Sequence, residues 1–420
     1  MHSFLIKGGT PLHGEVEISG AKNAVLPIMA AALLTRDECV IHNAPVLSDV
    51  SFMGRVLTSL GAKVRQRGHT ITIQADRING HGDYELVRKM RGSICILGPL
   101  LARLKHAEVS FPGGCVIGAR PIDLHLKAMR ALGANVKVEA GYVVAKARRL
   151  EGVRMFLGGK AGPTVLGTAN AMMAATLAEG VTVIESAACE PEIVDLANFL
   201  NAMGARIEGA GSPTITITGV KELHGAEHAV IPDRIEAATL AIAAAATRGE
   251  VTLKGARPDH MHAVLDKLVT MGVKVDWDAN GLTVKGVRDL QPTDVTTQPY
   301  AGFPTDVQAQ MTVLLTQAPG VSIVTERIFE SRFMHIGELL RLGADITLEG
   351  PSAVIKGPAR LSGAAVMASD LRASAALVVA GLIARGETLV KRVYHLDRGY
   401  EKLEVKLRRL GASVQRLKRS

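Results

Sequence analysis

Apolar and polar residues follow a pattern that recurs six times along this chain. In each copy an alanine-rich apolar run predicts a buried helix, and an alternating run predicts a strand after it. A second helix then ends at a short motif with a central glycine, and the six copies read SLGAKV, ALGANV, AMGARI, TMGVKV, RLGADI and RLGASV. The glycines are Gly61, Gly133, Gly204, Gly272, Gly343 and Gly411. They stand 68 to 72 residues apart, each where a helix C-cap is expected before a strand.

A further pair of alternating runs closes most copies, as in LTVKGVRDLQPTDVT and AVIKGPARLSGAAVMAS, and predicts a hairpin. The last copy lacks it, but FLIKGGTPLHGEVEIS at residues 4–19 supplies one. We therefore expect the N-terminus to complete the sixth copy. Each copy corresponds to a βαβαββ unit, and three units form each domain. The expected domains are residues 21–231, and residues 1–20 together with 232–420.

The length and composition fit a two-domain protein. The chain has 420 residues, of which 47% are hydrophobic, and it contains no low-complexity tract. We find no secretory leader and no apolar run near the roughly 20 residues of a spanning helix, so we expect a cytoplasmic protein without a membrane partner. Cys39, Cys95, Cys115 and Cys189 show no paired spacing, which favours reduced thiols.

The net charge of +9 permits two kinds of partner, a nucleic acid or an anionic small molecule. Only 3% of the residues are aromatic, which leaves little material for stacking nucleic-acid bases. The composition therefore favours anionic metabolites, although charge alone does not decide between them.

Several cations stand at predicted helix starts, where the helix dipole disfavours them. Asp233 and Asp370 at such positions are readily explained as helix caps. The cations have no such explanation, and they are Lys22, Arg91, Arg120, Arg332, Arg372 and Arg398. Any one arginine is readily explained as solvated surface charge. Six at equivalent positions favour a site for phosphate or carboxylate groups.

The segment Ser110-Phe-Pro-Gly-Gly-Cys-Val-Ile-Gly-Ala-Arg-Pro121 predicts an exposed loop because it is rich in glycine and proline. It places Cys115 near backbone amides and Arg120, a setting that lowers a thiol's pKa. Cys115 is thus a candidate reactive thiol, whereas the other three cysteines lie in contexts typical of inert packing. His260 and His262 have no acidic or cysteine partner at ligand spacing, so we expect a helix start there and no metal site.

Several stretches together resemble one family along nearly the whole chain. They are GAKNAVLPIMAAALL, SFPGGCVIGARPIDLH, EPEIVDLANFL, PDRIEAATL, FPTDVQAQ, ESRFMHIGEL, DLRASAALV and YHLDRGYEKLE. The chain is similar to the UDP-N-acetylglucosamine 1-carboxyvinyltransferases, which belong to the enolpyruvyl transferases. The resemblance implies a two-domain inside-out α/β barrel with three repeats per domain and an active site in the cleft between the domains. It also implies transfer of the enolpyruvyl group of phosphoenolpyruvate to the 3-hydroxyl of UDP-N-acetylglucosamine, a step in peptidoglycan precursor synthesis, without a cofactor.

The same resemblance assigns roles to residues. Cys115 is implied as the acid, and Asp306 as the group that faces the sugar hydroxyl and accepts its proton. Lys22, Arg120 and Arg398 are implied to hold phosphoenolpyruvate, with Arg332 and Arg372 nearby. The implied contacts of the UDP-sugar are Asn23, Arg91, Arg120, Pro121, Ile122, Asp123, Leu124, Lys160, Gly162, Pro163, Asp306 and Ile328.

Two positions depart from the family pattern, Ser48 in place of an expected lysine and the KAGPT sequence at residues 160–164. Both bear on substrate contacts and not on the reaction. Three alternatives remain open: the related enzyme that acts on shikimate 3-phosphate, a basic protein that binds or processes nucleic-acid ends, and a paralogue that binds the UDP-sugar without turnover. The oligomeric state is not indicated by the sequence.

Overall fold

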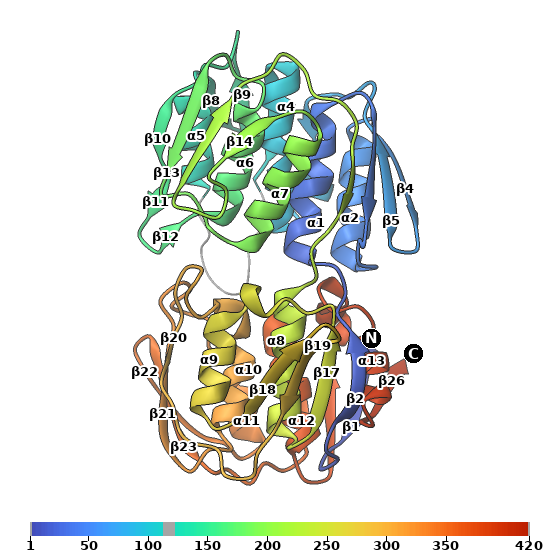
Figure 1. Ribbon diagram of the computed structural model, residues 1–420, viewed down its shortest axis with the longest axis vertical. Coiled ribbons are helices and arrows are strands. Elements are labelled where there is room, and N and C mark those ends of the chain that lie inside the picture. The colour runs from blue at the N-terminus through green and yellow to red at the C-terminus, as the bar shows by residue number, and fades with distance from the viewer. Residues whose placement is uncertain (1, 112–121, 419–420) are drawn as a thin grey trace. The chain divides into compact units, whose positions relative to one another are not determined.

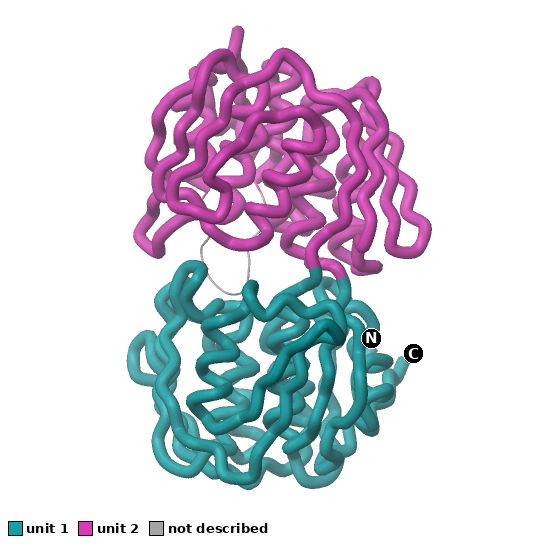
Figure 2. The backbone as a smooth tube through the Cα atoms, in the orientation of Figure 1, with its two compact units in different colours: residues 1–19, 116–118, 232–420 teal, residues 20–115, 119–231 magenta. Residues whose placement is uncertain are grey.

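The structure is a computed structural model that describes residues 2–111 and 122–418 (Figure 1). The described residues divide into two compact units (Figure 2). Unit 1 comprises residues 2–19 and 232–418, and unit 2 comprises residues 20–111 and 122–231. The chain passes from unit 1 to unit 2 after Ser19 and returns after Ile231. Each unit has its own hydrophobic core.

Each unit contains three four-stranded sheets, and all six share one pairing pattern. A short edge strand pairs in parallel with a second strand, the second pairs antiparallel with a third, and the third pairs antiparallel with a fourth. In unit 2 the strands are β3 (Glu38–His42), β4 (Lys63–Arg67), β5 (Thr70–Gln74), β6 (His81–Gly82), β7 (His106–Ser110), β8 (Asn135–Glu139), β9 (Tyr142–Lys146), β10 (Arg154–Phe156), β13 (Val181–Glu185), β14 (Arg206–Glu208), β15 (Thr214–Thr218) and β16 (Glu227–Ala229). A separate small hairpin pairs β11 (Gly158–Gly159) with β12 (Gly162–Pro163).

The sheets of unit 1 repeat this arrangement. Their strands are β1 (His2–Lys7), β2 (His13–Glu17), β17 (Glu250–Lys254), β18 (Lys274–Asp278), β19 (Gly281–Lys285), β20 (Val295–Thr296), β21 (Gly320–Thr325), β22 (Asp345–Glu349), β23 (Ser352–Gly357), β24 (Ala365–Met367), β25 (Glu387–Lys391) and β26 (Ser413–Lys418). The three sheets of a unit are not hydrogen-bonded to one another among the described strands, so neither unit is a closed barrel of strands.

Helices fill the space between the sheets of each unit (Figure 1). One helix of each repeat is almost wholly buried: α1 (Lys22–Ala31), α4 (Leu97–Leu104) and α6 (Val165–Ala175) in unit 2, and α8 (Arg234–Ala246), α10 (Gln308–Leu315) and α12 (Leu371–Ile383) in unit 1. The second helix of each repeat buries one side: α2 (Ser48–Ser59), α5 (Asp123–Ala131), α7 (Pro191–Ala202), α9 (His262–Thr270), α11 (Met334–Arg341) and α13 (Leu403–Arg409). A short α3 (Tyr84–Val87) and five 3-10 turns complete the described helices: η1 (Ala32–Leu34), η2 (Arg91–Ile96), η3 (Pro258–His260), η4 (Thr305–Val307) and η5 (Val393–Arg398).

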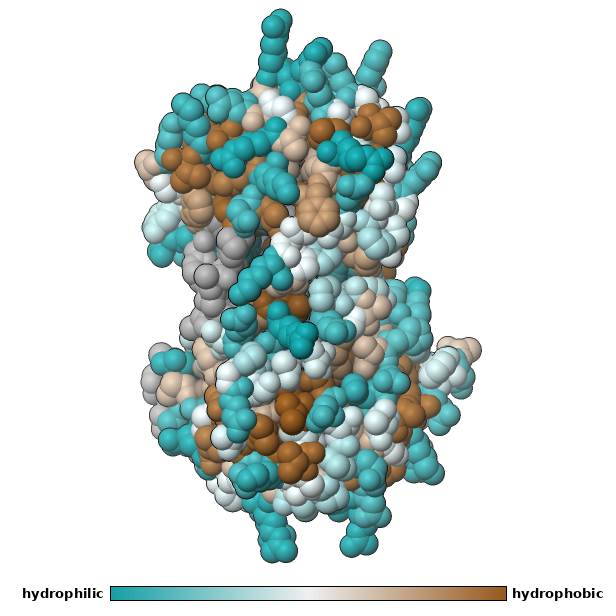
Figure 3. Space-filling view, turned by 90° about the vertical axis from the view of Figure 1, so that its left-hand side faces the viewer, coloured by the Kyte–Doolittle hydropathy of each residue, from teal (hydrophilic) through white to brown (hydrophobic). Residues whose placement is uncertain are grey.

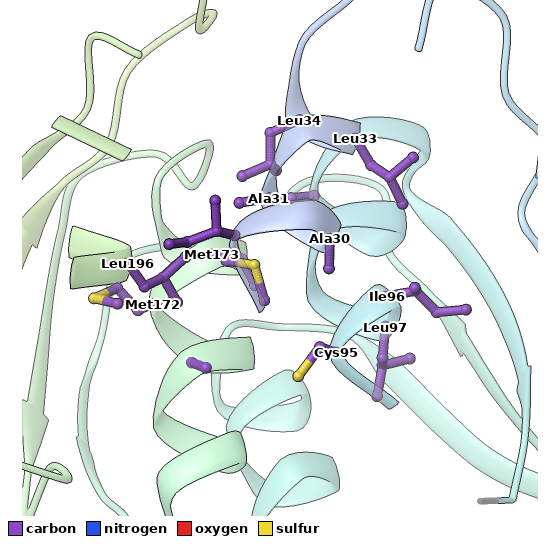
Figure 4. Packing of buried hydrophobic residues seen from close by; sticks show 14 of the residues in the cluster. Ala30, Ala31, Leu33, Leu34, Cys95, Ile96, Leu97, Met172, Met173 and Leu196 are labelled. Atoms are coloured by element: carbon purple, nitrogen blue, oxygen red, sulfur yellow. The ribbon is translucent and has the colours of Figure 1, made fainter. Parts of the chain in front are cut away.

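Small side chains explain why the first helices sit at the centre. From Ile235 to Ala246 every residue of α8 is buried, and most of them are alanine, which lets neighbouring helices approach closely. Figure 4 shows part of the corresponding core of unit 2, with side chains contributed by α1, η2, α4, α6 and α7. On the face of the molecule drawn in Figure 3, hydrophobic residues lie in separate small groups among hydrophilic ones.

All six motif glycines end a helix as predicted. Their φ angles lie between +89° and +103°, a region that glycine enters at low cost. At Gly61 the amide donates to the Thr58 carbonyl and the next amide, that of Ala62, donates to the Leu57 carbonyl. The same two bonds recur at the other five glycines, so each helix ends in a Schellman motif.

The βαβαββ order is confirmed along the chain, but the predicted closing hairpins are wrong. β19 and β20 belong to different sheets, and β20 pairs in parallel with β21, which follows the buried helix α10. A long connection such as residues 286–294 does not enforce hairpin pairing as a tight two-residue turn does. The alternating run after a repeat is therefore an edge strand of another repeat, and β6, β10, β20 and β24 each open the next repeat along the chain.

The N-terminal strand completes the last repeat, as predicted. β1 lies between β25 and β26 and pairs antiparallel with both. β2 does not stay with β1, since it pairs in parallel with β17 and is the edge strand of the fourth repeat. β16 does the same for the first repeat, where it pairs with β3. The chain thus closes each unit by returning one strand from a distant part of the sequence.

No helix within the described ranges is both long and apolar enough to cross a membrane.

Candidate functional site

One carboxylate joins two of the candidate arginines in unit 1. Asp306 lies in η4 at the start of α10, Arg332 lies just before α11, and Arg372 lies in the first turn of α12. Arg332 Nη2 is 2.7 Å from Asp306 Oδ1, and Arg372 Nη2 is 3.4 Å from Oδ2. Two consecutive repeats, the fifth with two helix starts and the sixth with one, therefore bring these starts together around one anion.

The burial of this cluster is uneven. The side chains of Arg332 and Arg372 are only 8% and 5% exposed, whereas Asp306 is 27% exposed. Burial raises the pKa of Asp306, but the charges and hydrogen bonds of Arg372 and Arg332 outweigh it and hold the pKa well below its usual range. The accessible carboxylate is therefore an ionised, weakly basic group in this arrangement.

Arg372 also contacts a buried tyrosine that the sequence did not single out. Its guanidinium carbon is 5.4 Å from the centre of the Tyr400 ring. The Tyr400 hydroxyl lies 2.9 Å from Thr239 Oγ1 and accepts a bond of 3.1 Å from Gln310. A tyrosine among charged residues carries no sequence signal for such a role, because its partners are 161 and 90 residues away.

The remaining candidates of unit 1 lie on short turns. Ile328 follows β21, and its amide donates to Glu326 Oε1 at 2.8 Å. Arg398 is half-buried at the end of η5 and stands before α13, so the expectation that it begins a helix is wrong. Asp370 and Asp233, in contrast, cap α12 and α8 as predicted, each by accepting two amides of the first turn.

In unit 2, Lys22 begins α1 and pairs with a carboxylate on the next helix. Its Nζ is 2.7 Å from Asp49 Oδ2, and the two side chains are 11% and 8% exposed. Asp49 lies in the first turn of α2, where an acidic residue is ordinarily explained by the helix dipole. That ordinary explanation is why sequence reasoning missed it. Ser48, which precedes it, is exposed at the first position of α2.

Arg91 begins η2 and influences a buried histidine on α5. Burial, and next the charge of Arg91, lower the pKa of His125 to about 3. His125 Nδ1 lies 2.9 Å from the Asn170 amide nitrogen, and Asn170 also binds Gly98 and Ile94 of the neighbouring helical segments. This neutral histidine helps to order the segment that carries Arg91. Asn23, the second residue of α1, is half-buried.

The other candidates of unit 2 lie around the start of α5 and the small hairpin. Ile122 is buried before α5, which begins with Asp123 and Leu124. Lys160 is exposed at the tip of the β11–β12 hairpin, and Gly162 has a φ of +95°. A Cβ atom placed on Gly159 would lie 3.1 Å from the Leu124 side chain, so the hairpin packs against the start of α5.

Three candidates, Cys115, Arg120 and Pro121, lie outside the described residues. The other cysteines behave as predicted for packed thiols: Cys39 and Cys95 are buried, and Cys189 is half-buried with its thiol facing the Ala187 carbonyl. Burial raises the pKa of all three, to about 12 for Cys95.

Within the described part of the chain, His, Cys, Asp and Glu side chains form no cluster that could hold a metal ion. His260 and His262 stand at the start of α9, but no side chain caps this helix. Asp259 instead binds Arg257 through two short bonds.

Comparison with known proteins places the chain in one family. The family described as EPSP synthase (3-phosphoshikimate 1-carboxyvinyltransferase) matches residues 6–407. Among individual relatives, UDP-N-acetylglucosamine 1-carboxyvinyltransferase from Methylacidiphilum infernorum is 54% identical over 417 residues, which are 99% of each chain. The protein of the same name from Desulfatibacillum aliphaticivorans is 53% identical over the whole of both chains.

Solved structures of enolpyruvyl transferases also match this chain over its whole length. The enolpyruvyl transferase NikO from Streptomyces tendae matches with a TM-score of 0.91 and 27% identity, over all of this chain and 99% of its own. EPSP synthase from Acinetobacter baumannii matches over the whole of both chains with a TM-score of 0.76 and 17% identity, a likeness of fold alone. Since the family match and the full-length relatives agree, this chain belongs to the enolpyruvyl transferase family and, within it, groups with the UDP-N-acetylglucosamine 1-carboxyvinyltransferases.

Proposed function

We propose that this protein transfers the enolpyruvyl group of phosphoenolpyruvate to the 3-hydroxyl of UDP-N-acetylglucosamine and releases phosphate. The observation that carries the proposal is the identity of 53–54% to enzymes of that name across at least 99% of the chain. The rival acceptor, shikimate 3-phosphate, is favoured only by the family's printed description and by fold likeness at 17% identity. The basic net charge needs no nucleic-acid partner when both substrates are anions.

The charges of the described residues suit this chemistry. We assign Lys22, Arg120 and Arg398 to phosphoenolpyruvate, with Arg332 and Arg372 beside them. Lys22 and Arg372 stand in the first turns of buried helices, where backbone amides and the dipole also attract anions. The UDP-sugar is assigned to three groups of contacts: Asn23 and Arg91; the segments 120–124 and 160–163; and Asp306 with Ile328.

The reaction is an addition followed by an elimination. The sugar 3-oxygen bonds to C2 of phosphoenolpyruvate while Cys115 delivers a proton to C3. The bond from C2 to the phosphate oxygen then breaks, a proton leaves C3, and the double bond re-forms. Each correctly placed acid or base contributes about 10²–10⁴-fold. Cations around the departing phosphate stabilise its developing charge.

Asp306 constrains how the hydroxyl proton leaves. With both oxygens bound to arginines and a lowered pKa, its carboxylate is a good hydrogen-bond acceptor but a poor base. It therefore orients the 3-hydroxyl first. It takes the proton only when the phosphate and carboxylate of phosphoenolpyruvate draw Arg332 or Arg372 away from it. Proton acceptance by Asp306 is therefore coupled to binding of phosphoenolpyruvate.

The proposed reaction is a first step in the synthesis of peptidoglycan precursors. We also propose a cytoplasmic location, where both substrates are made. The reaction needs no cofactor, because the substrates carry the reactive double bond and the leaving group.

The test is phosphate release from phosphoenolpyruvate with either UDP-N-acetylglucosamine or shikimate 3-phosphate as acceptor. We expect release with the UDP-sugar alone, and a loss of at least about 100-fold in Cys115→Ala. Cys189→Ala, which removes a half-buried thiol, is the control and should retain full activity. Release with shikimate 3-phosphate alone would overturn the acceptor. Release with neither would leave a protein that binds the UDP-sugar without turnover.

A further inference from the structure

Glu326 is a fully buried carboxylate that the proposed reaction does not use. It stands at the end of β21, with 0% of its surface exposed. Four donors from two segments satisfy its oxygens: Thr297 Oγ1 at 2.7 Å, Thr305 Oγ1 at 2.8 Å, the Ile328 amide at 2.8 Å and the Phe329 amide at 3.0 Å. Two of these donors belong to the proposed site or lie next to it. Thr305 precedes Asp306, and Ile328 is itself a proposed contact of the UDP-sugar.

Thr305 carries the influence of Glu326 to the arginine cluster. Its hydroxyl has one hydrogen, which it donates to Glu326 Oε2. The lone pairs of the same oxygen are then free to accept from Arg332 Nη1, at 2.9 Å. The other terminal nitrogen of Arg332 donates to Asp306 Oδ1 at 2.7 Å. The guanidinium plane is thus fixed at two points, and the direction of one hydrogen bond is set by the buried carboxylate.

We infer that Glu326 is a positioning residue for the proposed reaction, acting through the Thr305 hydroxyl to hold Arg332 against Asp306. The inference rests on the proposed function for its effect on catalysis, but the hydrogen-bond relay exists independently of it. A carboxylate only accepts hydrogen bonds, so the Thr305 hydroxyl has one possible direction. The relay therefore ends on a guanidinium at one side and a buried anion at the other.

Glu326→Gln tests this directly, because it keeps the shape and changes the polarity. The Ile328 and Phe329 amides need an acceptor, so the glutamine oxygen faces them and its amine faces Thr305. Thr305 then accepts from the glutamine with one lone pair and from Arg332 with the other, and its hydrogen no longer has the carboxylate as its acceptor. The bond from Arg332 to Thr305 is no longer held in direction by a buried anion, although no atom has been removed from the arginine, threonine or aspartate.

We expect Glu326→Gln and Thr305→Val each to lower kcat/KM for the UDP-sugar by about 10–100-fold, the range of a charged hydrogen bond. Thr305→Ser keeps the hydroxyl and should stay within about threefold of the parent. Because both changes break one relay, the double variant should be no more than about threefold worse than Thr305→Val alone. Multiplied effects in the double variant would mean that Glu326 acts only by holding its loop.

A second readout needs no turnover. The carboxyl carbon of Asp306, followed by carbon-13 NMR against pH without substrates, should titrate at higher pH in Thr305→Val than in the parent. Arg372, Tyr400, Asp233 and the charge of Glu326 are unchanged in Thr305→Val, so the shift reports Arg332, whereas Glu326→Gln also removes a negative charge, which by itself lowers the pKa of Asp306. Glu236→Gln, which alters another buried carboxylate of unit 1 held by Lys406, should leave that titration in place.

The outcomes separate the two claims. If the parent releases no phosphate with the UDP-sugar, the proposed function fails while the NMR titration still decides the relay. If the parent is active, both Glu326→Gln and Thr305→Val keep its activity, and Thr305→Val keeps the titration of Asp306, the positioning role is overturned. Should Glu326→Gln fail to fold, Thr305→Val, which leaves the buried carboxylate its other three donors, carries the test.

Discussion

Unit 1 and unit 2 hold their candidate charges in different ways. In unit 1 a single carboxylate, Asp306, binds two arginines, and hydrogen bonds continue inward through Thr305 to Glu326. In unit 2 Lys22 and Asp49, on adjacent helices, form an ion pair. The first arrangement is a network in which one carboxylate binds two cations, whereas in the second one carboxylate pairs with one lysine.

The difference indicates a division of labour. A network of buried groups fixes geometry before substrate arrives, which is what acid–base and charge-stabilising chemistry needs. In the ion pair of unit 2, Lys22 can exchange the Asp49 carboxylate for a substrate anion. We therefore expect changes in unit 1 to act on kcat and changes in unit 2 to act on KM. Three of the four predictions below test this contrast in kinetics, and one compares the stability of the two units.

Asp306→Asn should have the largest effect. It removes the carboxylate that pairs with two nearly buried arginines, so kcat should fall by about 10²–10⁴-fold and unfolding should become easier by up to about 3 kcal/mol. Phosphate release and thermal unfolding measure the two effects. Asp345→Asn, at an exposed position of β22 in the same unit, is the control.

If Asp306→Asn raises KM with kcat unchanged, the network serves binding and the contrast between the units disappears. The stability effect also has a pH dependence. The lowered pKa of Asp306 gives stability that is present above the unfolded value near 3.8 and is lost as pH falls through the folded value. The difference in stability between parent and variant should therefore shrink below about pH 4.

The sequence predicted the repeats well because they depend on local rules. A glycine after each helix, an alternating strand and a buried alanine-rich helix are visible within some 70 residues, and all six Schellman motifs followed from them. The edge strands were assigned wrongly because pairing between β20 and β21 depends on a crossover through α10. Alternation shows that a segment is a strand but not which strand it joins.

The site was predictable as a list of cations but not as a set of partners. Charges at helix starts stand out against the dipole rule, which led to Lys22, Arg91 and Arg372. Their partners are far away in sequence: Asp306 is 66 residues from Arg372. Glu326 gave no signal at all, because a lone glutamate after a strand is ordinarily solvated, and only the fold shows it to be buried.

Two histidines give the next largest effect, and they occupy equivalent positions eight residues before a motif glycine. Burial, the larger cause in each case, lowers the pKa of His335 in unit 1 to about 4 and that of His125 in unit 2 to about 3. A histidine with a lowered folded pKa loses stability as pH falls from the unfolded value near 6.5 toward the folded one. His335 alone should cost about 3 kcal/mol between pH 6.5 and 4.

His335→Leu tests this in unit 1, where Nε2 of the parent histidine has no hydrogen-bond partner among the described residues. Its unfolding free energy should fall by about 3 kcal/mol less than that of the parent over the same pH range. His125→Leu breaks the contact with Asn170 as well, so it should be less stable than the parent already at pH 8. Denaturation curves at pH 8, 6 and 4 measure both. Parallel pH curves for His335→Leu and the parent would show that His335 takes up its proton without cost.

Lys22 and Asp49 give the third prediction. Lys22→Gln removes a cation from the proposed phosphoenolpyruvate site and should raise KM for that substrate by about 30-fold, equivalent to roughly 2 kcal/mol. Asp49→Asn keeps the cation and loosens only its placement, so about threefold is expected. Steady-state kinetics at saturating UDP-sugar measure both, with Lys63→Gln on the exposed strand β4 as control. Equal effects of the two changes would mean that the ion pair works as one unit, as the network of unit 1 does.

Ser48→Lys should have the smallest effect. It tests the contrast between the units by adding a cation to unit 2 instead of removing one. The family resemblance leads us to expect a lysine here, but this chain has an exposed serine at the first position of α2, next to Asp49. A cation at a helix start costs about 0.3–1 kcal/mol, and attraction to Asp49 and to a substrate phosphate opposes that cost. The two terms nearly cancel, so KM for the UDP-sugar should change by no more than about threefold.

Ser51→Lys adds the same charge to an exposed position of the same helix and separates a local effect from a change in net charge. A tenfold gain in Ser48→Lys alone would show that unit 2 lacks a binding group, and that its paired lysine does not suffice to hold the substrate.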